Sequence, residues 1–175
     1  MRSMTSQPAG LQPPVLTEPA SAFQRCTNAR CAAMFSVRDV LVACPRCGEL
    51  LDVAYRWSAK LGTSWNRYDV RSTTRGPRNA AGLAATPAAL DFSGVWRFRD
   101  LLPFYEDETQ IVTLGEGRTN LQKADHLACE IGMNLSGGGE LFLQYEGFNP
   151  SGSFKDNGMA AAFTHARMVG AKRVR

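Results

Sequence analysis

The sequence predicts a mixed α/β region that follows a small cysteine-rich module. Apolar residues recur at helical spacing over about 121–132. A short strand-like run over 140–146 is followed by a turn and by a helix over about 154–169. Four of the five cysteines fall within 22–57, among short strand-like runs. Together these patterns predict a cysteine-rich module over 22–57 and the start of an α/β domain over 94–175.

The remaining parts of the chain differ from these two in composition. Residues 1–21 contain four prolines and few large apolar side chains, which is typical of a disordered tail. Residues 58–93 are basic at first and then rich in Ala, Gly and Pro, and we interpret them as a linker that includes one short helix.

The overall composition excludes several classes of protein. The 175 residues are 44% hydrophobic and 21% charged, with a net charge of +4 that is spread thinly. No block of like charge indicates a nucleic-acid partner, and no apolar run is long enough to span a membrane. The first residues lack the apolar core of a secretory signal. A cytoplasmic protein is therefore expected, in which cysteines stay reduced.

The cysteine-rich module has the spacing of a metal site. Cys26 and Cys31 form one pair, and Cys44 and Cys47 form a second within a Cys-Pro-Arg-Cys-Gly segment. Two close pairs on turns between strands can supply the four thiolates that tetrahedral zinc prefers. Four protein ligands leave no open position for water, so we expect the zinc to be structural. The alternative is four unligated thiols.

Further expectations concern strands, arginines and the fifth cysteine. The strand-like runs of the module lie at 34–37, 40–43 and 50–55. Outside the module, another strand is expected to start near Lys172. Four arginines are scattered through the module, and we interpret them as a solvated face: Arg25, Arg30, Arg38 and Arg46. Cys129 falls on the apolar side of the helix predicted over 121–132 and is expected to be buried.

A lysine stands at the start of the helix predicted over 154–169. Ser153 can cap this helix by accepting from the N–H of Asp156, whose carboxylate can return a bond. Lys155 then occupies the second helical position, where the helix dipole disfavours its charged form, as an imine-forming amine requires. An ordinary capped helix with a solvent-facing lysine explains the same residues, and local pattern does not decide between the two.

A family resemblance gives this lysine a specific interpretation. The stretch Gln144–Met159, which contains Asn-Pro-Ser-Gly-Ser-Phe-Lys-Asp, resembles the lysine motif of threonine synthase. Upstream, Val112–Thr119 and Trp96–Pro103 resemble two further segments of that family, in the same order. The cysteine module is similar to one that some members carry. The resemblance covers about 22–175 and implies the N-terminal part of a fold-type II pyridoxal-phosphate enzyme, related to the tryptophan synthase β subunit.

The resemblance implies an activity and a site. Lys155 would form the Schiff base with pyridoxal 5′-phosphate, and Ser153 and Asn157 are assigned to the same cofactor site. The implied lyase reaction converts O-phospho-L-homoserine and water to L-threonine and phosphate. The cofactor serves as the electron sink for the carbanions involved. A homodimer is left open for the full-length enzyme.

The sequence departs from the family pattern in three places. Asn120 stands where proline is usual, Asn157 where arginine is usual, and Gln144 where lysine is common. The glycine-rich phosphate loop of the family is also missing from the sequence, so we expect a truncated or split chain that is inactive alone. Two alternatives stay open. One is a sibling reaction, such as cysteine or cysteate synthesis or threonine deamination. The other is a non-catalytic zinc-ribbon interaction protein.

Overall fold

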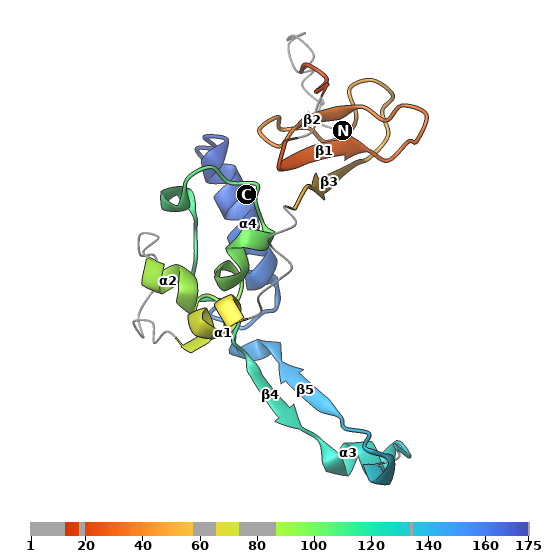
Figure 1. Ribbon diagram of the computed structural model, residues 1–175, viewed down its shortest axis with the longest axis vertical. Coiled ribbons are helices and arrows are strands. Elements are labelled where there is room, and N and C mark those ends of the chain that lie inside the picture. Colours follow the sequence, from red (N-terminus) through yellow and green to blue (C-terminus); the bar gives the residue numbers. More distant parts are fainter. Residues whose placement is uncertain (1–12, 18–19, 58–65, 74–86, 134, 175) are drawn as a thin grey trace, which may run out of the picture. The chain divides into compact units, whose positions relative to one another are not determined.

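The computed structural model describes residues 13–17, 20–57, 66–73, 87–133 and 135–174, and these form two compact units (Figure 1). Unit 1 contains the described residues up to 57 together with Leu102–Phe104, and unit 2 contains the rest. Most of the predicted disordered tail lies outside the described residues, as do 58–65 and 74–86 of the predicted linker. The architecture is mixed α/β with small sheets.

Unit 1 is built on a three-stranded antiparallel sheet. Its strands are β1 (Ala22–Cys26), β2 (Met34–Ser36) and β3 (Leu51–Tyr55), in the order β2-β1-β3. The strands predicted near 34–37 and 50–55 are confirmed, whereas β1 was not predicted. The core consists of Cys26, Ala33, Phe35 and Cys44, with Cys31, Leu41 and Leu51 packed against it. Sulfur atoms thus take the central place that apolar side chains hold in larger domains.

The strand predicted over 40–43 is wrong. The carboxylate of Asp39 accepts from the N–H of Ser36 at 3.2 Å, which closes a turn directly after β2. The following residues run to Cys44 without a strand partner, and the side chains of Val40 and Val42 are 73% and 94% exposed. Alternating apolar residues predict a strand only where another strand is available to pair with them.

Unit 2 contains the remaining helices and strands. The first of them in chain order are α1 (Asn66–Thr73), α2 (Pro87–Phe92) and the 3₁₀ helices η2 (Trp96–Leu101) and η3 (Glu108–Gln110). They are followed by β4 (Asn120–Lys123), α3 (Asp125–Glu130), the 3₁₀ helix η4 (Leu135–Gly137), β5 (Phe142–Tyr145), the 3₁₀ helix η5 (Glu146–Phe148) and α4 (Lys155–Met168). The predicted helix over 154–169 is confirmed by α4, and the predicted strand over 140–146 by the shorter β5.

Helix α4 packs through a single stripe. Its buried residues are Asp156, Ala160, Thr164 and Met168, which recur at every fourth position. The hydroxyl of Thr164 accepts from the N–H of Val112 at 2.9 Å, and the carbonyl of Val112 accepts from the indole N–H of the fully buried Trp96. These bonds connect α4 to the segment before β4, which lies beside the lysine site.

The helix predicted over 121–132 begins too early. Residues Asn120–Lys123 form β4, which pairs antiparallel with β5, and the helix α3 starts only at Asp125 (Figure 1). Pairing with a strand more than twenty residues later overrides the helical spacing of the apolar side chains. The expected burial of Cys129 is also wrong. Cys129 is exposed, because α3 buries only Ala128.

The last described residues of the chain, 171–174, lie in no helix or strand. Residues Lys172, Arg173 and Val174 form no strand, so the strand expected there is not observed in the described residues. Among the described helices, none combines the length and the apolar character needed to cross a membrane.

Candidate functional site

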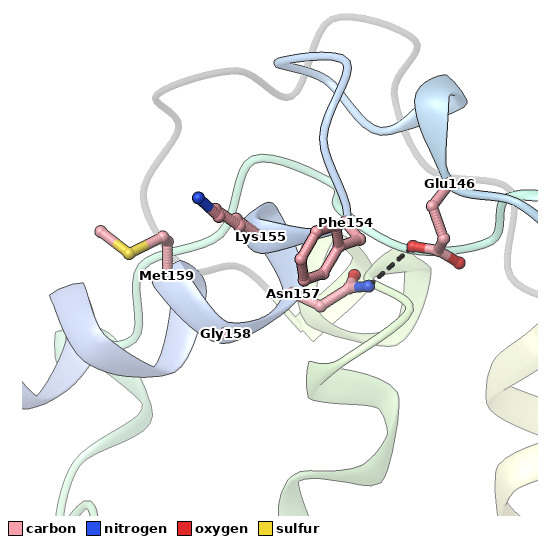
Figure 2. Close-up of a pocket in the computed structure, with 6 residues that line it drawn as sticks. All are labelled: Glu146, Phe154, Lys155, Asn157, Gly158 and Met159. Atoms are coloured by element: carbon pink, nitrogen blue, oxygen red, sulfur yellow. Dashed lines mark hydrogen bonds between the residues drawn. The ribbon is translucent and has the colours of Figure 1, made fainter.

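Lys155 lies at an open cavity of about 750 Å³ at the start of α4. The cavity is lined by Glu146, Phe154, Lys155, Asn157, Gly158 and Met159 (Figure 2). In Figure 2 the amine of Lys155 points away from Glu146. Within the described part of the chain this ammonium forms no ion pair. The residues bring together an accessible primary amine, a carboxylate, an amide and an aromatic ring.

The predicted capping arrangement at the start of α4 is not the one observed. The helix begins at Lys155 with Phe154 as its N-cap, so Lys155 is its first residue and not its second. Ser153 Oγ accepts from the N–H of Lys155 at 3.2 Å. The Asp156 carboxylate accepts from the N–H of Ser151 at 2.7 Å and also from its hydroxyl. The turn before the helix brings Ser151, and not Ser153, over the first helical turn.

A hydrogen-bonded network around Glu146 fixes the cavity wall. Its carboxylate accepts from Thr119 Oγ1 at 2.7 Å, from Asn149 Nδ2 at 2.8 Å and from Asn157 Nδ2 at 3.0 Å. Gln144 Nε2 donates in turn to Thr119 Oγ1 at 2.8 Å. The three donors come from the segment before β4, from the turn after β5 and from α4. One carboxylate therefore joins three segments at the position of the lysine.

The same donors determine the charge of Glu146. The hydrogen bonds from Thr119, then Asn149, and then Asn157 lower the pKa of Glu146 below its ordinary value. Donors that favour the ionised form of a carboxyl group have this effect. Glu146 is therefore a carboxylate at neutral pH and only accepts hydrogen bonds.

Acidification is expected to weaken this network. Since the folded-state pKa of Glu146 is lowered, its contribution to stability is complete above the unfolded pKa of about 4.3 and is lost as the pH falls through the folded pKa. Urea unfolding at pH ~7 and pH ~3 measures the loss. Glu146→Gln, which does not titrate, should show a smaller acid dependence. An equal acid dependence in the two proteins would contradict this assignment.

Another carboxylate, which is buried, positions the segment before β4. Glu116 is fully buried and accepts from Ser93 Oγ at 2.5 Å, from Thr113 Oγ1 at 2.9 Å and from the N–H of Leu114 at 2.8 Å. The next residue, Gly117, donates its N–H to Asn149 Oδ1 at 2.8 Å. This segment is thereby connected directly to the Glu146 network.

The structure brings together some of the residues assigned from the sequence. Lys155 and Asn157 line the same cavity, and Ser153 contacts the backbone of Lys155 without lining it. Sequence reasoning missed Glu146, Asn149 and Thr119 as members of the site. The turn residue Asn149 carried a partial signal, because Asn-Pro favours a turn. Nothing in the spacing connects Thr119 with Glu146.

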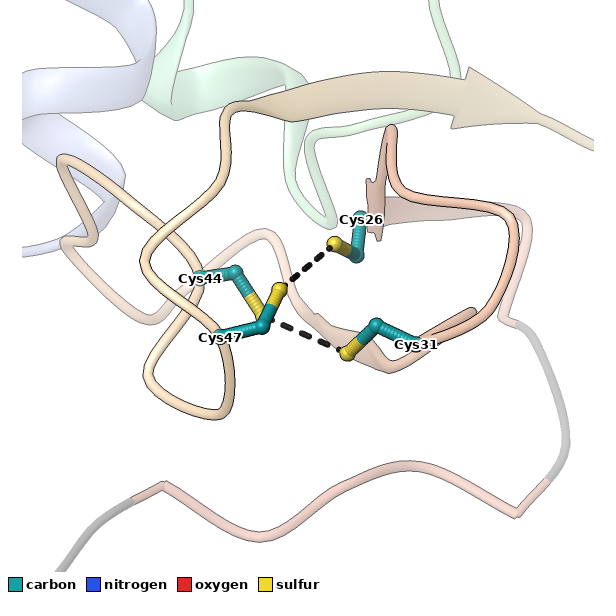
Figure 3. Close-up of side chains that lie close together, drawn as sticks. All are labelled: Cys26, Cys31, Cys44 and Cys47. Carbon is teal, nitrogen blue, oxygen red and sulfur yellow. Dashed lines mark hydrogen bonds between the residues drawn. The ribbon is translucent and has the colours of Figure 1, made fainter.

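The four cysteines predicted as ligands converge in unit 1 (Figure 3). Their sulfur atoms all lie within 4.8 Å of one another, with Cys26 and Cys47 Sγ at 3.5 Å and Cys31 and Cys44 Sγ at 3.8 Å. Zinc–sulfur bonds of about 2.3 Å place tetrahedral sulfur ligands about 3.8 Å apart. The group could hold a metal ion, and its dimensions fit zinc.

Backbone hydrogen bonds lower the pKa of one thiol of the second cysteine pair. Burial alone raises the pKa of Cys44, but hydrogen bonds from the N–H groups of Arg46 and Cys47 lower it to about 7. Gly48 has a φ of 77°, as the turn after the pair requires. Burial raises the pKa of Cys26 to about 12 in the absence of a cation. A bound cation would favour the thiolate form of all four.

Comparison with known proteins identifies similar enzymes. No family model matches the chain. The chain is 32% identical over 153 residues to a threonine synthase from Methanocaldococcus jannaschii, covering 87% of this chain and 31% of the relative. It is 33% identical over 144 residues to one from Methanosarcina acetivorans, covering 82% and 28%. A threonine synthase from Synechocystis is 38% identical over 108 residues, covering 58% and 27%.

These matches confirm the resemblance stated from the motifs. Most of the chain is similar to an N-terminal portion of threonine synthases. The chain spans about three tenths of the length of the first two relatives.

Proposed function

Because the chain matches an N-terminal portion of threonine synthases, we propose that it supplies the cofactor-anchoring lysine of a pyridoxal-phosphate-dependent lyase. The reaction is the conversion of O-phospho-L-homoserine and water to L-threonine and phosphate. The observation that carries the proposal is the position of Lys155, an accessible amine at the first residue of α4 on the wall of a cavity.

The residues present fit the cofactor in two respects. The cavity of about 750 Å³ lies within the range of about 300–1,000 Å³ that is typical of small-molecule sites. The side chain of Lys155 is exposed at the first residue of α4, so a carbonyl group can reach its amine. When bound, pyridoxal phosphate supplies an electron sink for substrate carbanions.

The roles proposed for this chain's residues concern the lysine cavity and the turn that precedes α4. Lys155 moves protons at the α, β and γ carbons of the substrate. Glu146 holds the first turn of α4 through Asn157, and so keeps the backbone of Lys155 in position. Asp156 holds the preceding turn through Ser151.

Lys155→Ala tests the proposal directly. The chain is incubated with pyridoxal phosphate and reduced with borohydride, and the labelled residue is identified by peptide mass spectrometry. We expect the label on Lys155 and its loss in Lys155→Ala. Lys172→Ala, which removes another exposed lysine, is the matched control and should label normally. Label distributed over the other lysines, or unchanged in Lys155→Ala, would reject the proposal.

The sibling activities are distinguished by their products. Once the lysine is labelled, product analysis with O-phospho-L-homoserine separates threonine formation from cysteine or cysteate synthesis and from threonine deamination. This measurement requires an enzyme that also contains the part of the relatives' length that the chain does not match. An enzyme with an amino-acid substrate is the proposal that the similar proteins support.

We further propose that Cys26, Cys31, Cys44 and Cys47 bind one structural zinc ion in unit 1. The convergence of four sulfur atoms within 4.8 Å supports it. The zinc would join the two cysteine turns and replace the apolar core that so small a module lacks.

A further inference from the structure

The orientation of the Asn157 amide is determined by Glu146. Asn157 Nδ2 donates to Glu146 Oε2 at 3.0 Å. In the reversed orientation two oxygen atoms would face each other, since a carboxylate has no hydrogen to donate. The lowered pKa of Glu146 keeps it a carboxylate at neutral pH. The amide is therefore held with its oxygen directed away from Glu146.

This orientation leaves Asn157 Oδ1 buried and without a hydrogen-bond partner. Arg97 Nε and Gln110 Oε1 are the other atoms of this kind among the described residues, and neither residue lines the lysine cavity. A buried acceptor without a donor is unfavourable and requires an explanation, of which an absent ligand is one.

The surroundings of Oδ1 determine which ligand group suits it. Phe154 lines the same cavity as Asn157 and is 63% exposed, so its ring can rotate without losing a packed position. The cavity then presents an acceptor oxygen, the negative charge of Glu146 and an aromatic ring. A carbonyl oxygen, a carboxylate and a ring together are complementary to an ammonium group.

We propose that Asn157 Oδ1 receives the α-ammonium group of an amino-acid ligand, with Glu146 as the residue that positions the amide. The inference rests on the proposed function, because an amino-acid substrate must bring its amino group next to Lys155. It adds the recognition of that group to the role of the lysine cavity.

Two probes that differ only in the amino group test the proposal. L-Homoserine carries the ammonium, and 4-hydroxybutyrate is the same molecule without it. Each is titrated into ¹⁵N-labelled chain, and the side-chain amide signals of Asn157 are followed by NMR. We expect L-homoserine, and not 4-hydroxybutyrate, to shift these signals. Asn157→Leu should weaken L-homoserine binding about tenfold or more, as measured by backbone signals near Lys155.

A second variant covers the case in which Asn157→Leu does not fold. Glu146→Gln changes one atom and allows the Asn157 amide to reverse, so it should weaken L-homoserine binding in the same direction. Gln122→Leu, at an exposed position of β4 outside the cavity, is the control and should leave binding unchanged. Equal binding of the two probes, no binding of either, or unchanged affinity in both variants would overturn the proposal.

The outcome is separable from that of the proposed function. If pyridoxal phosphate fails to label Lys155 while L-homoserine still binds through Asn157, the ammonium site stands and the cofactor proposal fails. If Lys155 is labelled and the probes do not discriminate, the reverse holds.

Discussion

Replacing Cys44 with serine is expected to remove most bound zinc and to unfold unit 1. Cys44 is both a proposed ligand and a member of the core cluster, whose other buried residues are Cys26, Ala33 and Phe35. Zinc binding by such sites contributes about 10–16 kcal/mol of apparent free energy at pH 7. A core this small cannot replace that contribution, so loss of one thiolate should affect the whole module.

The measurement combines metal analysis with spectroscopy. Purified protein should contain about one zinc per chain, as four thiolate ligands imply, and Cys44→Ser should contain little. The dispersed amide signals of β1, β2 and β3 should collapse in the variant and on addition of a strong chelator. Cys129→Ser is the matched control, because Cys129 is exposed and lies outside the cluster. If zinc is low in all three proteins, the cluster does not bind it; if Cys44→Ser retains zinc, Cys44 is not a ligand.

Replacing Gly117 with alanine is expected to destabilise unit 2 more than the same replacement at Gly132. Gly117 has a φ of 76°, which disfavours any residue with a Cβ. The added Cβ would also lie 2.6 Å from Gly94 Cα, a backbone atom that cannot move alone. A positive φ costs about 1–2 kcal/mol and overpacking about 1–3 kcal/mol more. The bond from the N–H of Gly117 to Asn149 would be disturbed as well.

Gly132→Ala separates the cost of a positive φ from the cost of overpacking. Gly132 has a similar φ of 74°, but nothing lies within 4 Å of an added Cβ. Urea unfolding should therefore place Gly132→Ala between the original protein and Gly117→Ala. The Gly117→Ala protein should also label more slowly at Lys155, because Asn149 and Glu146 lose their support. Equal destabilisation by the two substitutions would show that the close approach of Gly94 and Gly117 carries no energetic weight.

The local sequence pattern was sufficient to predict several helices and strands. Helix α4 was predicted almost to its ends, because its apolar and small residues repeat at helical spacing and Gly170 follows it. The strand β5 and the strands β2 and β3 were predicted from runs of apolar residues between turns. The four cysteines were predicted as one group from their spacing, which limits the turns they can occupy.

The errors have a common physical cause. Residues Asn120–Lys123 have helical spacing but form β4, because β5 supplies paired N–H and carbonyl groups. Val40 and Val42 alternate like strand residues but have no partner strand. The cap predicted for Ser153 is replaced by the bonds between Asp156 and Ser151. Each outcome depends on a partner whose position the local pattern does not contain.

The sequence by itself determined the grouping of the four cysteines, the lysine-bearing helix and the resemblance to threonine synthases, since each is expressed in residues close together in the chain. Only the tertiary structure decided that the Glu146 carboxylate accepts hydrogen bonds from Thr119, Asn149 and Asn157. It also decided that Asn157 Oδ1 is left without a donor. Thr119 and Glu146 are 27 positions apart, and a hydrogen bond over that separation forms only when folding brings their segments together. Spacing along the chain constrains neighbours, and the rest of the site depends on packing between segments.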